Sequence, residues 1–152
     1  MKNIKIDIKM RIEEITLYHP DMLVAINKFL NLLVENEFLI TKQVVEAIIS
    51  DTNSHLFFAI DGEGVYLGML TVGFYYAPTG KKAWIEDVVV DEKYRGQGVG
   101  KELTNFAIQF VKDQLADVLM LTSNPARKEA NNLYKKIGFQ QKVTNVYRIV
   151  LK

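Results

Sequence analysis

A run of alternating glycines between two basic residues is the part of this chain best suited to bind an anion. Glycine lets the backbone bend tightly and lets a ligand approach it closely. If a helix begins here, the N–H groups of its first turn and its dipole add positive charge, and the two basic side chains add more. The pattern therefore predicts a phosphate-binding loop made of Arg95, Gly96, Gln97, Gly98, Val99, Gly100 and Lys101.

The spacing of these glycines differs from that of two common nucleotide-binding motifs. A P-loop needs G-x-x-x-x-G-K-[ST], but Gly100-Lys101 is followed by Glu102, and the first glycine position is Arg95. A dinucleotide-binding fingerprint needs G-x-G-x-x-G after the first strand of a βαβ unit, whereas G-x-G-x-G lies late in this chain. The loop is thus a phosphate site of another kind, and the alternative is a glycine-rich turn that only starts a helix.

The elements before the loop are expected to be one strand, two helices and three further strands. Apolar residues that alternate with charged ones predict a half-buried strand over 4–12. One helix is expected to start at Pro20, and a shorter one to have Thr41 as its N-cap. Short turns separate the next three extended segments, so these are expected to pair antiparallel over 56–60, 65–76 and 83–90.

The elements after the loop are expected to be a helix, a strand, a last helix and closing strands. Apolar residues at helical spacing follow Val99, and residues 118–122 have the composition of a short buried strand. The last helix is expected to have Asn124-Pro125 as N-cap and first position and Gly138 at its C-terminal cap. Residues 139–151 are expected to form one or two strands. The order predicts an α/β fold with helices packed on a mixed sheet.

Length and composition narrow the class of protein. The 152 residues suit one domain, 1–152, and the formal net charge of +1 gives no drive toward nucleic acid or an anionic membrane. The absence of cysteine excludes disulfides, thiolate metal sites and a cysteine nucleophile. His19 and His55 have no third ligand in view, so no metal is expected. Without an export signal or an apolar run that could span a membrane, the expected location is cytoplasmic.

Three blocks of the sequence together resemble the GNAT superfamily of acetyl-CoA-dependent N-acetyltransferases. Residues 95–100 match the family signature [QR]-x-x-G-x-[GA], and residues 84–94 are similar to its fourth strand and the approach to the loop. Residues 121–124 and 127–139 are similar to its fifth strand and closing helix, with the family's spacing. The resemblance covers 83–139 and implies a mostly antiparallel mixed sheet of 6–7 strands flanked by about four helices.

The resemblance also implies how acetyl-CoA would be bound. Main-chain groups of Val88, Val89 and Val90 are expected to face the pantetheine arm, where the fourth and fifth strands of the family separate. The glycine loop is expected to contact the pyrophosphate. Further contacts are expected from Asn124, Arg127 and Ala130, although many members have Asn where Arg127 stands, so the contact made by this arginine stays open.

Amine acetylation suggests roles for a few side chains. A typical alkylammonium has a pKa near that of lysine, so a base helps to remove its proton at neutral pH. Glu86 is the leading candidate for this base and Asp87 the alternative, since neighbours in a regular strand point to opposite faces unless a bulge intervenes. The resemblance implies that the Val88 N–H stabilises the developing oxyanion and that the Tyr134 hydroxyl serves the leaving thiolate.

The leading hypothesis is an N-acetyltransferase in which a primary amine attacks acetyl-CoA directly in a ternary complex. The acceptor, a small-molecule amine or a protein amino group, is not identified by the sequence, and neither is the oligomeric state, monomer or homodimer. The alternative from a different class is a non-catalytic acyl-CoA-binding module or sensor. No basic stripe interleaved with aromatic residues points to nucleic acid.

Overall fold

The computed structural model describes residues 9–34 and 37–151. The chain divides into two compact units, Met1–Thr122 and Ser123–Lys152. Residues 4–8 of the first predicted strand lie outside the described residues. No helix in the described ranges is long and apolar enough to cross a membrane.

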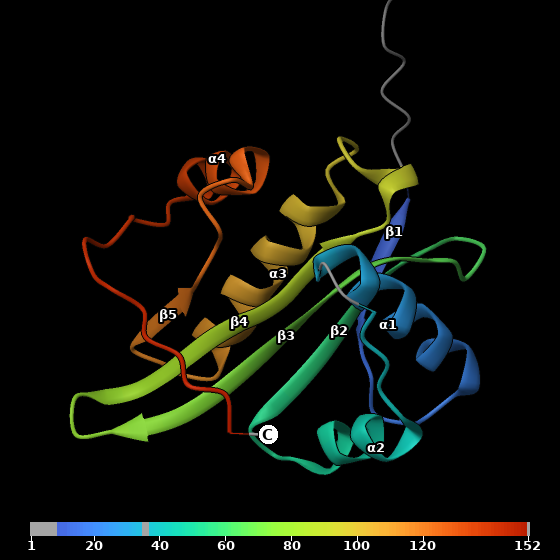
Figure 1. Cartoon of the computed structure of the whole chain (residues 1–152), viewed down its shortest axis with the longest axis horizontal. Helices are drawn as coiled ribbons and strands as arrows, with labels where there is room; N and C mark the ends of the chain where they lie inside the picture. The colour runs from blue at the N-terminus through green and yellow to red at the C-terminus, as the bar shows by residue number, and fades with distance from the viewer. Residues whose placement is uncertain (1–8, 35–36, 152) are drawn as a thin grey trace, which may run out of the picture. The chain divides into compact units, whose positions relative to one another are not determined.

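Within its described residues, the first unit contains a five-stranded sheet in the order β1-β2-β3-β4-β5 (Figure 1). The first three pairs of neighbours are antiparallel, as predicted for β2 with β3 and for β3 with β4, and β4 pairs with β5 in parallel. A parallel neighbour can be reached only through a crossover connection, which here contains the helix α3 (Val99–Asp113). The strands are β1 (Met10–Glu14), β2 (Ser54–Asp61), β3 (Tyr66–Ala77), β4 (Gly80–Val90) and β5 (Val118–Leu121).

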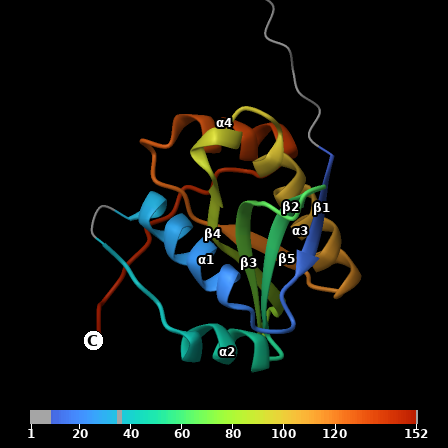
Figure 2. The same ribbon diagram turned by 90° about the vertical axis from the view of Figure 1, so that its right-hand side faces the viewer.

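Three helices of the first unit cover the two faces of this sheet (Figures 1 and 2). The helices α1 (Pro20–Leu33) and α2 (Lys42–Ser50) lie on one face, and α3 (Val99–Asp113) lies on the other. Pro20 and Thr41 take the predicted positions at the starts of α1 and α2. The apolar spacing therefore predicted both helices correctly, because each buries one face against the sheet.

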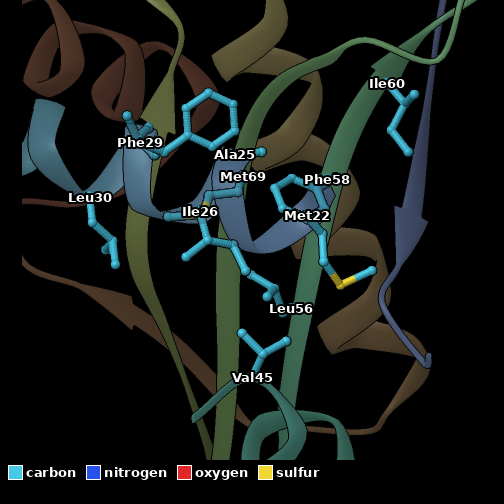
Figure 3. Packing of buried hydrophobic residues seen from close by; sticks show 11 residues of the cluster. Met22, Ala25, Ile26, Phe29, Leu30, Val45, Leu56, Phe58, Ile60 and Met69 are labelled. Atoms are coloured by element: carbon cyan, nitrogen blue, oxygen red, sulfur yellow. The ribbon is translucent and has the colours of Figure 1, made fainter. Parts of the chain in front are cut away.

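The core on the face of α1 and α2 joins both helices to β2, β3 and β4 (Figure 3). Its buried members are Met22, Ala25, Ile26, Phe29, Leu30, Val45, Leu56, Phe58, Ile60, Met69 and Val89. On the opposite face, the ring of Phe57 packs edge-on against Phe106 and Phe110 of α3, at centroid distances of 5.1 and 4.9 Å. Consecutive residues 57 and 58 thus serve opposite cores, which is the alternation that a strand covered on both faces requires.

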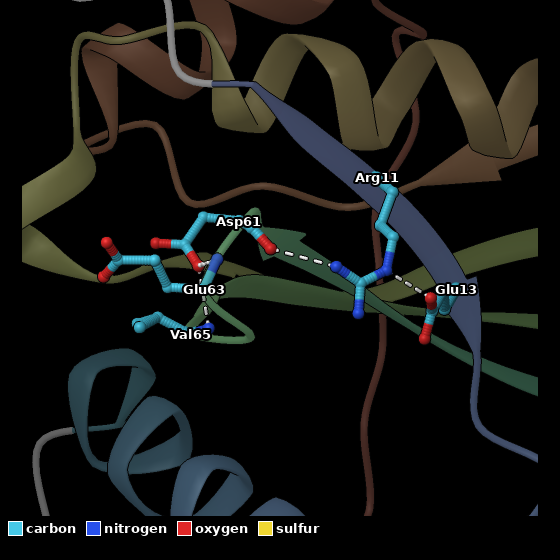
Figure 4. Close-up of polar contacts among 5 residues, drawn as sticks. All are labelled: Arg11, Glu13, Asp61, Glu63 and Val65. Carbon is cyan, nitrogen blue, oxygen red and sulfur yellow. Dashed lines mark hydrogen bonds and ion pairs between the residues drawn. The ribbon is translucent and has the colours of Figure 1, made fainter.

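A tight turn joins β2 to β3 and is built around one carboxylate (Figure 4). Asp61 Oδ1 accepts from the N–H groups of Glu63 and Val65, each at 2.9 Å. The Arg11 side chain of β1 donates to the Asp61 carbonyl oxygen at 3.0 Å and forms an ion pair with Glu13. These contacts fix both the turn and the edge strand β1.

The second unit contains the helix α4 (Lys128–Ile137), which begins later than predicted. Its N-cap is Arg127, so the prediction of an Asn124-Pro125 start is wrong. Asn124 Oδ1 accepts from the Ala126 N–H at 2.9 Å, which closes a turn before the helix rather than capping it. Gly138 ends the helix with φ 117°, as predicted.

The predicted closing strands do not form in the structure. Residues 139–151 contain neither helix nor strand, and the large apolar side chains Val146, Tyr147, Ile149, Val150 and Leu151 are exposed. The alternating pattern there has the period of a strand, but a strand also needs a hydrogen-bonded neighbour, which a local pattern does not provide. The sheet therefore has five strands in the described residues, where 6–7 were expected.

Candidate active site

The predicted phosphate loop connects β4 to α3 and exposes its backbone. The 3₁₀ helix η1 (Glu92–Tyr94) follows β4, and Gly98 is the N-cap of α3. Gly96 and Gly98 have φ of 73° and 90°, a region that side-chain-bearing residues rarely adopt. A Cβ placed on either glycine would meet no atom within 4 Å, so both face open space.

The start of α3 is suited to an anionic group. A glycine N-cap has no side chain that could accept from the N–H groups of the first helical turn. Those groups and the helix dipole therefore favour an anion such as a phosphate at this end. With the open glycine backbone, this arrangement suits a phosphate group, as the sequence predicted.

Side chains around the loop tie it to the end of β4. Arg95 Nε donates to the Val90 carbonyl oxygen at 3.3 Å, and Arg95 also lies 3.6 Å from the Glu92 carboxylate. Gln97 Nε2 donates to the Lys93 carbonyl oxygen at 2.9 Å. Arg95 and Gln97 were expected to contact the ligand, and in the structure their side chains bind to residues of η1 and of the end of β4.

A β-bulge interrupts β4 just before the loop. Thr71 of β3 pairs with Glu86 and Met69 pairs with Val89, so Asp87 and Val88 together lie opposite one residue, Leu70. Asp87 has φ 51°, a conformation that Asp tolerates better than most residues. Such bulges re-aim side chains and are frequent next to active sites.

The bulge changes the prediction about the two acidic residues. In a regular strand Glu86 and Asp87 would point to opposite faces, but the structure leaves both of them exposed. Partial burial raises the pKa of the Glu86 carboxyl, and the negative charge of Asp87 raises it further. Partial burial also raises the pKa of Asp87. Raised values bring carboxylates closer to the range useful for a base at neutral pH.

Pairing between the two parallel strands ends just before these acids. Pairing of β4 with β5 ends at Ile85 and Leu121, and β4 continues past that point to Val90. The residues Val88 to Val90, expected to face a pantetheine arm, lie in this continuation. The first unit therefore brings the acids, the bulge and the phosphate loop together along one strand and its exit.

The remaining predicted site residues lie in the second unit. Arg127 is the N-cap of α4, and the Asn124 carbonyl oxygen accepts from its N–H at 3.0 Å. Ala130 lies in the first turn of the helix. Tyr134 is buried and packs edge-on against Phe139, with ring centroids 5.9 Å apart. Burial raises the pKa of the Tyr134 hydroxyl, which the Arg127 charge partly offsets, so the hydroxyl keeps its proton at neutral pH.

One residue of the first unit was missed by sequence reasoning. Asp91 follows β4 directly, is only 5% exposed, and pairs with Lys28 of α1. Its position before Glu92 and Lys93 has the composition of a cap for a short helix, which could have drawn attention to it. In the ranges that the structure covers, no group of three or more His, Cys, Asp or Glu could hold a metal ion.

Comparison with known proteins points to one family. The model of the acetyltransferase (GNAT) family matches residues 25–139. Streptothricin acetyltransferase of Streptomyces lavendulae is 29% identical over 89 residues, which are 59% of this chain and 46% of that protein. Thialysine N-epsilon-acetyltransferase of Mus musculus is 31% identical over 87 residues, which are 53% of this chain and 51% of that protein. The chain thus spans about half the length of these curated relatives.

A solved structure extends the similarity of the fold over nearly the whole chain. An aminoglycoside acetyltransferase from an uncultured soil metagenomic sample, in complex with sisomicin, superimposes with a TM-score of 0.78. The match covers 93% of this chain and 96% of that one at 16% sequence identity, so it supports the fold alone.

Proposed function

Because the chain belongs to the acetyltransferase (GNAT) family, we propose that it transfers the acetyl group of acetyl-CoA to a primary amine. The amine attacks the thioester directly while both substrates are bound. The amine belongs to a small molecule or to a protein amino group, and one relative is named for acetylation at the Nε position of thialysine.

The observation that carries the proposal is the arrangement along the second half of β4. Two acids with raised pKa values lie at a bulge of β4, just beyond the point where its pairing with β5 ends. The same strand then leads into a glycine loop whose open backbone suits a pyrophosphate. The candidate base and the phosphate site thus lie along the same strand. This arrangement suits an acyl donor such as acetyl-CoA, in which the pantetheine arm separates the thioester from the pyrophosphate.

Acetyl-CoA supplies the activated acetyl thioester, and the chain's residues bind and orient it. Residues 96–101 bind the pyrophosphate through main-chain N–H groups, with Arg95 and Lys101 adding positive charge. Val88, Val89 and Val90 face the pantetheine with main-chain groups, much as an added strand would. Asn124, Arg127 and Ala130 border the rest of the coenzyme.

The chemical step needs one proton removed and one supplied. Glu86 accepts the ammonium proton, directly or through a water molecule, and leaves a lone pair for attack on the carbonyl carbon. The Val88 N–H stabilises the negative charge that develops on the thioester oxygen. As the C–S bond breaks, the Tyr134 hydroxyl donates a hydrogen bond or a proton to the departing sulfur. We assign this role to Tyr134 because its position matches that of the family's tyrosine.

The experiment follows free thiol release from acetyl-CoA with a panel of primary amines, and coenzyme A binding by calorimetry. We expect binding, and amine-dependent thiol release with at least one acceptor. Gly98→Asp should abolish binding because a carboxylate at an anion site repels phosphate. The substitution also strains the backbone, because a residue with a Cβ disfavours a φ of 90°.

Gly64→Asp is the matched control. Gly64 has φ 86° and open space around it, so the substitution carries the same backbone cost outside the loop. It should leave coenzyme A affinity unchanged. Binding without turnover on any amine would favour the non-catalytic alternative. Equal affinity in wild type and a folded Gly98→Asp protein would contradict the assignment of the loop.

A further inference from the structure

The turn between β4 and the phosphate loop is organised around one buried carboxylate. Asp91 is 5% exposed, and its backbone and side chain together make hydrogen bonds with three other elements, β3, η1 and α1. A buried carboxylate is unfavourable unless hydrogen bonds or an opposite charge compensate for lost water. We therefore expect the contacts of Asp91 to do more than fill space in the fold.

These contacts come from the two ends of the turn and from α1. The Asp91 N–H donates to the Leu67 carbonyl oxygen of β3, and its own carbonyl oxygen accepts from the Tyr94 N–H, both at 2.9 Å. Asp91 Oδ1 accepts from the Lys93 N–H at 3.1 Å and so caps η1. Asp91 Oδ2 accepts from Lys28 Nζ of α1.

The hydrogen bond from Lys28 differs from the others because its donor lies on the helix α1. A cavity lies between this helix and the turn that contains Asp91. It has a volume of about 380 Å³ and is lined by Val24, Lys28, Asp91 and Tyr94 among others. Lys28 reaches along this cavity to Asp91, while Ala25 and Phe29 beside it in α1 are buried in the core. A firmly packed helix thus holds the turn through one side chain.

The turn is also hydrogen-bonded to the phosphate loop. Lys93, whose N–H is bound to Asp91, also accepts a hydrogen bond from Gln97 through its carbonyl oxygen at 2.9 Å. The chain of contacts therefore runs from Lys28 through Asp91 and Lys93 to the middle of the glycine run. Binding of an anion by main-chain N–H groups depends on their being held in place beforehand, because ordering a free loop costs affinity.

We propose that Lys28 and Asp91 form a positioning ion pair that holds the phosphate loop in its acetyl-CoA-binding conformation. The proposal rests on the function proposed above. Lys28 would act through Asp91 without touching the coenzyme. Burial of Asp91 opposes its ionisation, but the hydrogen bonds and charges of Lys28 and Lys93 prevail and lower the pKa of its carboxyl, so Asp91 is a carboxylate at neutral pH.

The experiment compares coenzyme A affinity and steady-state kinetics of Lys28→Met, Lys28→Arg and wild type. Methionine keeps an unbranched apolar chain and removes the charge. We expect Lys28→Met to raise the KM for acetyl-CoA and the calorimetric Kd for coenzyme A about tenfold, which corresponds to about 1.4 kcal/mol. The kcat at saturating substrates should stay within about twofold, because the reacting groups are untouched. Lys28→Arg should restore most of the affinity.

The matched control is Lys42→Met on α2. Both lysine side chains are 53% exposed and each is paired with a carboxylate, but the partner of Lys42 is Glu46 in its own helix. Lys42→Met should leave both constants unchanged. Amide hydrogen exchange gives an independent readout without substrate: residues 96–101 should exchange faster in Lys28→Met than in wild type or the control.

The outcomes separate this proposal from the proposed function. Wild type that binds coenzyme A, with a folded Lys28→Met protein of the same affinity and loop exchange, would overturn the positioning role alone. A fall in kcat with an unchanged KM would also overturn it. Wild type that fails to bind coenzyme A would overturn the proposed function and this role with it. Should Lys28→Met unfold, Asp91→Asn provides the same test, with the same expected loss of affinity.

Discussion

At the scale of single residues, the charge of Asp87 acts on the neighbouring carboxyl of Glu86. The charge of Asp87 raises the pKa of Glu86, and partial burial raises the pKa of both. Because the charged forms are disfavoured in the folded protein, their contribution to stability is largest below the ordinary carboxyl pKa. It is lost as pH rises through the raised values. Glu86→Gln should therefore fold at neutral pH at least as well as wild type.

The effect of Asp87 on Glu86 predicts different pH profiles for two similar substitutions. In wild type, kcat/KM should rise with pH as the base loses its proton, with a midpoint above the usual pKa of a glutamate. Glu86→Gln should remove this rise and lower kcat by about 10²-fold or more. Asp87→Asn should keep the rise but move it to lower pH, because the charge that raises the pKa of Glu86 is gone.

The measurement is the pH dependence of kcat/KM for the three proteins with one acceptor. If Asp87→Asn removes the rise and Glu86→Gln keeps it, the base is Asp87. If neither substitution removes it, both assignments are wrong.

The sequence alone identifies these two acids as candidates, but it does not predict that both side chains are exposed. Alternation predicts opposite faces for Glu86 and Asp87, and only the register of β4 on β3 reveals the bulge that exposes both. Likewise, the pairing of Asp91 with Lys28 joins residues far apart in the chain. Such pairings depend on the tertiary arrangement of α1 and the turn, which local patterns do not encode.

At the scale of elements, β3 and β4 leave no room for a side chain at Gly68, near the end of β4. Gly68 pairs with Val90, and a Cβ on Gly68 would lie 2.6 Å from the Val89 carbonyl oxygen and 3.3 Å from Leu103. Real Cβ atoms do not approach backbone so closely. The two strands therefore need glycine at this position for β4 to reach the phosphate loop in its observed path.

Gly68→Ala should therefore strain the end of β4. We expect the free energy of unfolding to fall by about 1–3 kcal/mol, as for other overpacked sites, with a weaker affinity for coenzyme A. Gly73→Ala is the matched control in the same strand, because a Cβ there meets no atom within 4 Å. It should change stability by less than about 0.5 kcal/mol.

Urea unfolding of the two variants and wild type measures the difference. Equal stabilities of Gly68→Ala and Gly73→Ala would show that β4 relaxes without cost at this point. The close approach would then have no structural importance.

The sequence predicted most elements because their patterns are local. Apolar spacing located α1, α2 and α3, and turn residues separated β2, β3 and β4. The prediction failed where a competing interaction or a missing neighbour decides the structure. Asn124 uses its side chain to close a turn with Ala126, and residues 139–151 have a strand pattern but form no strand.

At the scale of the first unit, the parallel pairing of β4 with β5 decides where the anion site lies. A crossover connection must lead from the end of β4 back to the start of β5. The helix α3 forms this connection on one face of the sheet. The N-terminus of α3 is thereby placed at the exit of β4. A ligand site at the carboxyl end of a parallel strand follows from this connection.

The same connection also orders the steps of folding. β2, β3 and β4 are joined by tight turns, so their pairing closes short loops at little entropic cost. β5 pairs only after all of α3 has intervened, and contacts between distant segments form more slowly. Pulse-labelled hydrogen exchange during refolding should therefore protect the amides of β2–β4 before those of β5, whereas simultaneous protection would contradict this order. A chain still being synthesised would possess the strand that carries Glu86 before it possesses the helix that completes the anion site.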